Sequence, residues 1–192
     1  MTLRLGVGVF GMQSVPQRPD HHVKLYRDVL EDAQLIESLG FDSIWLSEHH
    51  FWFDGYCPAD IAVAGAILGR TKRLGVGTAV MLLPMHSVQK VADDAATISR
   101  LGEGRLTLGV ALGYRDPEFD GVGGRRQERG KTLDTRLPRL AESCRHAETA
   151  DPKHTGAPTT VAATRPAPGG TPRRSTAHAN TTPGRAIDSA TP

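Results

Sequence analysis

Four short runs of the chain are apolar at nearly every position, without the alternation of apolar and polar residues that marks a half-exposed strand. Such runs are typical of parallel strands that are covered on both faces of a sheet. They comprise residues 3–10, 43–46, 74–81 and 105–112. The pattern therefore predicts four buried strands.

Helical patterns fill the intervals between these strands. Residues 22–39 place apolar side chains three and four positions apart, and Gly40 follows as a stop signal. Further helices are predicted over residues 59–68 and 88–101. Repeated βα units with right-handed crossovers build either an open, doubly wound sheet or a (β/α)8 barrel. The chain is thus predicted to be an α/β protein with about four of the eight units of a TIM-barrel-type fold.

A dinucleotide-binding fold is the alternative to weigh, because residues 6–11 match the pattern G-x-G-x-x-G. That motif needs a helix to open at its third glycine, so that the helix N-terminus can hold a pyrophosphate. Gly11 instead leads into Met-Gln-Ser-Val-Pro. These glycines therefore lie inside a strand, where they are expected to allow close approach of another group, such as a flat ligand.

The composition changes sharply along the chain. All phenylalanine, tyrosine and tryptophan residues lie between Phe10 and Phe119, and from Pro138 onward Ala, Thr, Pro, Arg and Gly dominate. A segment without large apolar side chains cannot offset the cost of ordering its backbone, roughly 1–2 kcal/mol per residue. We therefore expect a folded unit over residues 1–135 and a low-complexity, disordered tail over 136–192. Such an abrupt change is typical of a reading-frame shift or a truncation.

Charge, hydropathy and cysteine content limit the partners and the cellular compartment that are expected for this protein. A formal net charge of +2 gives no case for nucleic-acid binding. No segment approaches the roughly 20 apolar residues of a membrane span, and the N-terminus lacks the organisation of a signal peptide. Cys57 and Cys144 lie on opposite sides of the composition break, which favours two reduced thiols. A cytoplasmic protein without membrane or nucleic-acid partners is expected.

Candidate chemistry follows the second predicted strand, which ends in Glu48, His49 and His50. The carboxyl ends of strands are where α/β folds place their active sites. Neighbouring strand residues point to opposite faces, so one histidine is expected to serve a site and the other to pack. The alternative is that both are half-buried rim histidines. No metal site is expected, because adjacent strand residues chelate poorly and no nearby Cys/His cluster completes a ligand set.

With these residues in view, the chain resembles the luciferase-like flavin-dependent oxidoreductases, the family of bacterial luciferase and of the F420-dependent reductases. The resemblance covers about residues 1–135, the N-terminal half of the family's barrel. Its motifs are Gly40-Phe-Asp-Ser-Ile-Trp-Leu-Ser-Glu-His-His-Phe51, Leu74-Gly-Val-Gly-Thr-Ala-Val-Met-Leu-Leu-Pro84 with His86, and Leu101-Gly-Glu-Gly-Arg-Leu-Thr-Leu-Gly-Val-Ala-Leu-Gly-Tyr-Arg-Asp-Pro-Glu-Phe119.

The resemblance implies a (β/α)8 barrel with FMN or coenzyme F420 at the carboxyl ends of the strands. It implies that His49 is an acid/base near the cofactor, a role that suits a group titrating near neutral pH. It also places the backbone of Thr78, Ala79 and Val80 against the isoalloxazine ring, with a cis peptide bond between Ala79 and Val80, and Ala111 beside the cofactor. The alternative for these small residues is ordinary barrel packing.

A charged loop with Arg115, Asp116 and Glu118 follows the fourth predicted strand, and we expect it to be an exposed turn rather than part of the catalytic machinery. The resemblance implies a flavin-dependent monooxygenase or oxidoreductase acting on a small molecule, shortened and inactive in this form. The alternatives are an F420-dependent reductase and a non-catalytic half-barrel that serves as an interaction module. The family's dimer contact would lie on helices 59–68 and 88–101.

Overall fold

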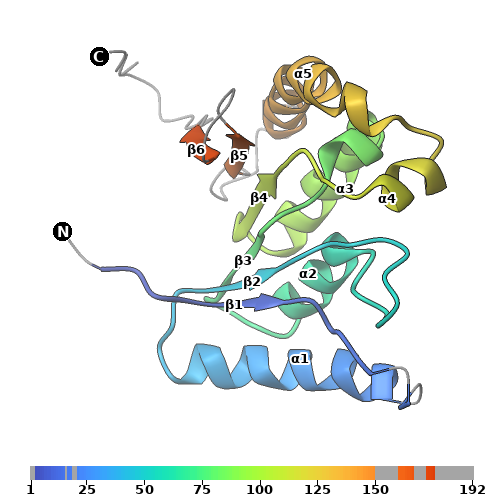
Figure 1. Ribbon diagram of the computed structural model, residues 1–192. Helices are drawn as coiled ribbons and strands as arrows, with labels where there is room; N and C mark the ends of the chain where they lie inside the picture. Colours follow the sequence, from blue (N-terminus) through green and yellow to red (C-terminus); the bar gives the residue numbers. More distant parts are fainter. Residues whose placement is uncertain (1–2, 16, 19–20, 150–159, 167–171, 176–192) are drawn as a thin grey trace.

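The computed structural model describes residues 3–15, 17–18, 21–149, 160–166 and 172–175 (Figure 1). These residues form one sheet with accompanying helices. In chain order the elements are β1 (Gly6–Phe10), α1 (His21–Ser38), β2 (Ser43–Leu46), α2 (Asp60–Leu68), β3 (Gly75–Thr78), η1 (Leu83–Met85), α3 (Val88–Leu101), β4 (Leu106–Val110), α4 (Asp116–Gly121), η2 (Arg126–Glu128), α5 (Arg129–Thr149), β5 (Thr160–Pro166) and β6 (Pro172–Ser175).

The sheet contains its strands in the order β1-β2-β3-β4-β5-β6. Strands β1 to β5 are parallel to their neighbours, and β6 is antiparallel to β5. The strand order follows the chain without reversal, as in a barrel, whereas a doubly wound sheet reverses its order at a switch point. The parallel arrangement also brings the carboxyl ends of β1 to β5 to one edge of the sheet.

The helices line one face of this sheet. Helix α1 contacts β2 and α2, α2 contacts β3 and α3, and α3 contacts β4 and α5 (Figure 1). Because α1, α2, α3 and α5 contact one another in succession, they form a continuous layer, as in the outer ring of a TIM-type barrel. The α/β fold built from (β/α) units is thereby confirmed.

The strand glycines admit the indole of Trp45. A Cβ atom added to Gly77 would lie 2.3 Å from Cε3 of Trp45, and one added to Gly6 would lie 2.8 Å from its Nε1. The close approach expected at the glycines of residues 6–11 is made at Gly6 by the side chain of Trp45 and at Gly11 by that of Tyr56. The loop after Gly11 does not open a helix, since α1 begins only at His21.

Most predicted elements agree with the structure to within a few residues. The predicted helix 88–101 matches α3, and Ser87 caps it by accepting a hydrogen bond from the backbone N–H of Lys90. Strand β2 has the predicted bounds, β1 begins three residues later than predicted, and β3 and β4 end earlier because their apolar ends continue into loops at the carboxyl edge. Gly40 follows α1 with φ of +84°, a conformation that favours glycine. Among the described helices, none combines the length and the apolar character needed to cross a membrane.

The structure extends beyond the boundary predicted at residue 135. Helix α5 continues to Thr149 and packs on α3, with Leu140 fully buried and Cys144 nearly so. Strand β5 pairs with β4 and buries Val161. Leucines 133, 137 and 140 with Cys144 keep the three- and four-residue spacing of a helix, a signal that the low aromatic content obscured. The rest of the expected tail, residues 150–159, 167–171 and 176–192, lies outside the described residues.

Candidate active site

A cavity of about 560 Å³ opens at the carboxyl edge of the sheet. Its walls come from β1 and from the segments that follow β2, β3 and β4, with one further residue from α5. This is the edge at which α/β folds bind their ligands. The lining residues are Val9, Ser47, Glu48, His49, Tyr56, Ala79, Val80, Leu82, Ala111, Leu112, Gly113, Tyr114 and Arg129.

His49 enters this cavity from the segment after β2. Its Nδ1 lies 2.7 Å from Oε1 of Glu118, whose side chain is completely buried. The rings of Trp52 and Tyr56 flank the imidazole, with centroids 4.5 Å and 4.7 Å away. Because a carboxylate only accepts hydrogen bonds, Nδ1 donates, and Nε2 is the ring nitrogen left to exchange a proton with a bound molecule.

Glu118 also joins two loops. Its Oε1 accepts a second hydrogen bond, of 3.0 Å, from the backbone N–H of His50. Arg115 lies 3.6 Å from the same oxygen, donates to the carbonyl of His50 at 3.1 Å, and places its guanidinium carbon 3.9 Å from the ring centre of Trp52. These contacts hold the loop after β4 against the loop after β2. The groups around the His49 side chain are thereby held in place.

The expectation of an exposed turn at residues 115–118 is therefore wrong for two of its three charged residues. Glu118 is buried and Arg115 is half-buried, because α4 (Asp116–Gly121) turns that side of the loop toward β2. Only Asp116 is exposed, where it pairs with Arg126 at 2.6 Å. Glu118, the residue that positions His49, was thus part of the sequence motif, but it was predicted to be exposed and is buried.

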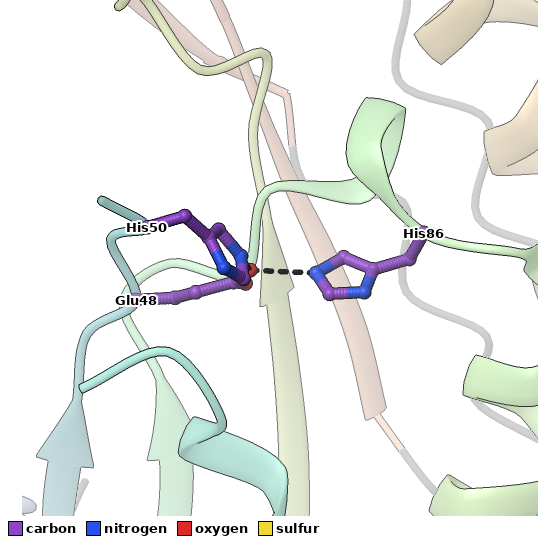
Figure 2. A group of neighbouring side chains, drawn as sticks. All are labelled: Glu48, His50 and His86. Carbon is purple, nitrogen blue, oxygen red and sulfur yellow. Dashed lines mark hydrogen bonds and ion pairs between the residues drawn. The ribbon is translucent and has the colours of Figure 1, made fainter. Parts of the chain in front are cut away.

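His50 does not line the cavity and joins a second cluster (Figure 2). Both His50 and His86 place Nε2 against Oε1 of Glu48, the latter at 2.6 Å, while Oε2 of Glu48 accepts from the backbone N–H of Leu82 at 2.8 Å. Burial raises the pKa of Glu48, but the hydrogen bonds from the two histidines outweigh it and hold the pKa at about 2. The hydrogen bond to Glu48 raises the pKa of His50. The sequence did not predict that His86 lies beside Glu48 and His50.

The structure brings together most residues that the resemblance placed at the cofactor. Ala79, Val80 and Ala111 line the cavity, and the Ala79–Val80 peptide bond is cis, as is Gly8–Val9. Thr78 differs, because its side chain is fully buried between strands. Its hydroxyl donates to the carbonyl of Gly109 at 2.8 Å and accepts from the same residue's N–H at 2.9 Å. The side chain of Thr78 therefore joins β3 to β4.

Arg129 is a cavity residue that sequence reasoning missed. It stands at the start of α5 and lines the cavity. One of its Nη atoms donates to the carbonyl of Arg126 at 2.9 Å. A guanidinium at a cavity edge is suited to an anionic group.

Comparison with known proteins decides the ancestry. The sequence profile of the luciferase-like monooxygenases matches residues 6–185. The chain belongs to this family. It is 37% identical over 87 residues to the alkanal monooxygenase alpha chain of the Kryptophanaron alfredi symbiont, covering 45% of this chain and 24% of that protein. It is 34% identical over 129 residues to the F420-dependent glucose-6-phosphate dehydrogenase of Amycolatopsis mediterranei, covering 65% of this chain and 38% of that protein.

Solved structures agree on the fold of this luciferase-like chain. The monooxygenase RslO1 from Streptomyces bottropensis superposes with a TM-score of 0.67 at 23% identity, covering 73% of this chain and 42% of that one. The chain thus spans less than half the length of the relatives named here. The family match extends to residue 185, whereas the resemblance in sequence motifs covers about residues 1–135.

Proposed function

We propose that this luciferase-like chain binds reduced FMN in the cavity beside His49 and supports oxidation of a small-molecule substrate. The observation that carries the proposal is the placement of His49 in one cavity with Ala79, Val80 and Ala111. An imidazole, which can donate or accept a proton, then faces a wall of small side chains against which a flat ring can lie.

The residues present fit a flavin nucleotide. The cavity volume of about 560 Å³ falls within the usual range of cofactor sites. Val9, Leu82 and Leu112 add to the apolar wall, which suits the faces of a tricyclic ring. The guanidinium of Arg129, which lines the cavity, is suited to the phosphate of the nucleotide.

When bound, reduced flavin supplies the electrons of the reaction. His49 would exchange a proton through Nε2 with the cofactor or the substrate, because Nδ1 is bonded to Glu118. The rings of Trp52, Tyr56 and Tyr114 surround the imidazole and would keep water from it. Glu118 would hold the imidazole in one tautomer and one orientation.

Binding experiments with FMN and riboflavin test this proposal. FMN photoreduced under argon is titrated with the chain, and binding is followed by anisotropy of the flavin. Arg129→Gln should weaken FMN binding by roughly 10-fold to 100-fold, since it removes hydrogen bonds to a charged group, and should leave riboflavin binding unchanged. Arg126→Gln is the matched control, because Arg126 lies three residues away and pairs with Asp116. A chain that binds neither flavin overturns the proposal and favours the non-catalytic half-barrel.

Reduced F420 is the alternative cofactor. It is supported by the F420-dependent relative from Amycolatopsis mediterranei, which the chain matches over 65% of its length. The same titration with F420 separates the two: tighter binding of F420 than of FMN would assign the chain to the reductases.

Self-association through α2 and α3 also remains a proposal. In α3, Val91, Ala92 and Ala95 are buried, and this helix packs on α5, whereas Ala62 and Ala66 of α2 are exposed. Ala62→Glu with Ala66→Glu should convert a dimer to a monomer in sedimentation analysis. An unchanged sedimentation coefficient would place the contact elsewhere.

A further inference from the structure

The cluster of Glu48, His50 and His86 offers three metal-binding atoms at one point. One donor atom of each residue lies within 4.8 Å of the other two. Glu48 and His50 come from the end of β2 and the residues after it, and His86 follows η1, so two loops converge here (Figure 2). His50 and His86 do not line the cavity beside His49, so this cluster is a separate site that shares only Glu48 with it.

We propose that Glu48, His50 and His86 bind a divalent transition-metal ion, with Zn²⁺ as the best match. Two imidazoles and one carboxylate form a common donor set for zinc, at ligand distances of about 2.0–2.2 Å. Ligands at that distance in a tetrahedron are about 3.4 Å apart. The Nε2 of His86 is now 2.6 Å from Oε1 of Glu48, so a small outward rotation of the side chains admits the ion.

Asp60 supports the proposal independently. This residue begins α2, is 1% exposed, and its Oδ2 has no hydrogen-bond partner in the described part of the chain. It lines a cavity of about 230 Å³ together with His86. A buried carboxylate oxygen without a hydrogen-bond partner is costly unless a cation compensates it.

Asp60 and His86 border the same cavity, so a buried carboxylate lies beside the proposed ligands. A divalent ion would balance the negative charges of Glu48 and Asp60. A water molecule would complete the four-coordinate site. Such an ion would tie the loop after β2 to the loop after β3.

Cobalt binding gives a direct test, because four-coordinate Co²⁺ has a characteristic visible spectrum and occupies zinc sites. The full chain, without a histidine tag and freed of metal with EDTA, is titrated with Co²⁺ and then with Zn²⁺. We expect one equivalent of Co²⁺ with a four-coordinate spectrum, its displacement by Zn²⁺, and a rise in Tm on adding Zn²⁺. Absence of the spectrum and of the Tm shift in the wild-type chain overturns the proposal and leaves the cluster as a set of ion pairs.

Variants then assign the ligands. His50→Gln and His86→Gln should each weaken Co²⁺ binding by at least about 10-fold, and Asp60→Asn, which removes one of the two balancing charges, should also weaken it. His49→Gln is the matched control, because it removes an adjacent imidazole that also pairs with a buried carboxylate. Equal losses for His49→Gln and His86→Gln would overturn the assignment. If a variant fails to fold by circular dichroism, the wild-type titration still decides.

Discussion

Nδ1 of His49 and Oε1 of Glu118 form a hydrogen bond of 2.7 Å, although 69 positions separate the two residues in the chain. The bond joins the loop after β2 to the helix after β4, so the geometry of one side chain depends on two βα units. Because the carboxylate accepts, the imidazole keeps its proton on Nδ1 whenever it is neutral. This relationship makes Glu118 a positioning residue whose effect should be measurable apart from binding.

Glu118→Gln should disturb the tautomer of His49 while leaving FMN binding intact. An amide can present either its oxygen or its NH₂ group to Nδ1, so the proton is no longer assigned to one nitrogen. Replacing a charged acceptor by a neutral one weakens the bond by about 1–1.5 kcal/mol, which corresponds to a rate loss of ~10-fold. The ¹⁵N shifts of the His49 ring report the tautomer, and stopped-flow reoxidation of bound reduced FMN reports the rate.

Asp116→Asn is the control for Glu118→Gln, since Asp116 lies on the same short helix but is exposed. It should change neither the ¹⁵N shifts nor the rate. Identical ring shifts in wild-type and Glu118→Gln proteins would remove Glu118 from its positioning role.

His49 and His50 should respond differently to the same substitution. His49→Asn should keep FMN bound and slow turnover by about 10²–10⁴-fold, the usual range for loss of a positioned proton-transfer group. In metal-free protein, His50→Asn removes a hydrogen bond to the buried Glu48 and should reduce the free energy of unfolding by about 1–3 kcal/mol. Urea denaturation and stopped-flow rates separate the two effects. Equal rate losses in the two folded variants would show that the assignment of His49 to the reaction and of His50 to stability is wrong.

Periodicity along the chain predicted the helices and strands from β1 to β4 well, because burial on two faces of a strand or on one face of a helix is a local property of the sequence. The position of Glu118 was not predictable in this way. Its burial depends on packing against His50, a contact between residues 68 positions apart. The meeting of Glu48 with His86 depends likewise on the parallel pairing of β2 with β3. Such contacts follow from topology and not from spacing.

Gly77→Ala should destabilise the protein through Trp45. The added Cβ would lie 2.3 Å from two ring atoms of Trp45, so the indole or β3 must move. Overpacking of this kind costs about 1–3 kcal/mol. Gly130→Ala in α5 is the control, because its Cβ would meet nothing within 4 Å, and a helical alanine is favoured over glycine by up to about 1 kcal/mol. Urea melts that rank the two variants in the opposite order would contradict the packing of Trp45 on the strand glycines.

Glu37 should make stability depend on pH in the acid range. Burial raises the pKa of Glu37, but hydrogen bonds from the backbone N–H groups of Arg73, Leu74 and Lys72 outweigh it and hold the pKa below its ordinary value. A lowered carboxyl pKa contributes stability above the unfolded pKa of about 4.3, and this contribution disappears as the pH falls through the folded value.

Glu37→Gln should therefore be less stable than the wild-type chain at pH 6, and the gap should close as the pH is lowered toward 3. Urea midpoints measured across this range test the sign. A gap that stays constant with pH would mean that the hydrogen bonds, and not the charge, account for the contribution of Glu37.

Leu140 decides whether the chain beyond residue 135 belongs to the folded unit. Its side chain is fully buried, and the helix that carries it packs on α3. Leu140→Ala should reduce the free energy of unfolding by about 2–5 kcal/mol, the usual cost of emptying a buried leucine site. Leu35→Ala in α1 is the control, because Leu35 is 56% exposed and should cost little. If both variants unfold at the wild-type urea concentration, α5 beyond residue 135 contributes nothing to stability, and the composition break marks the end of the fold.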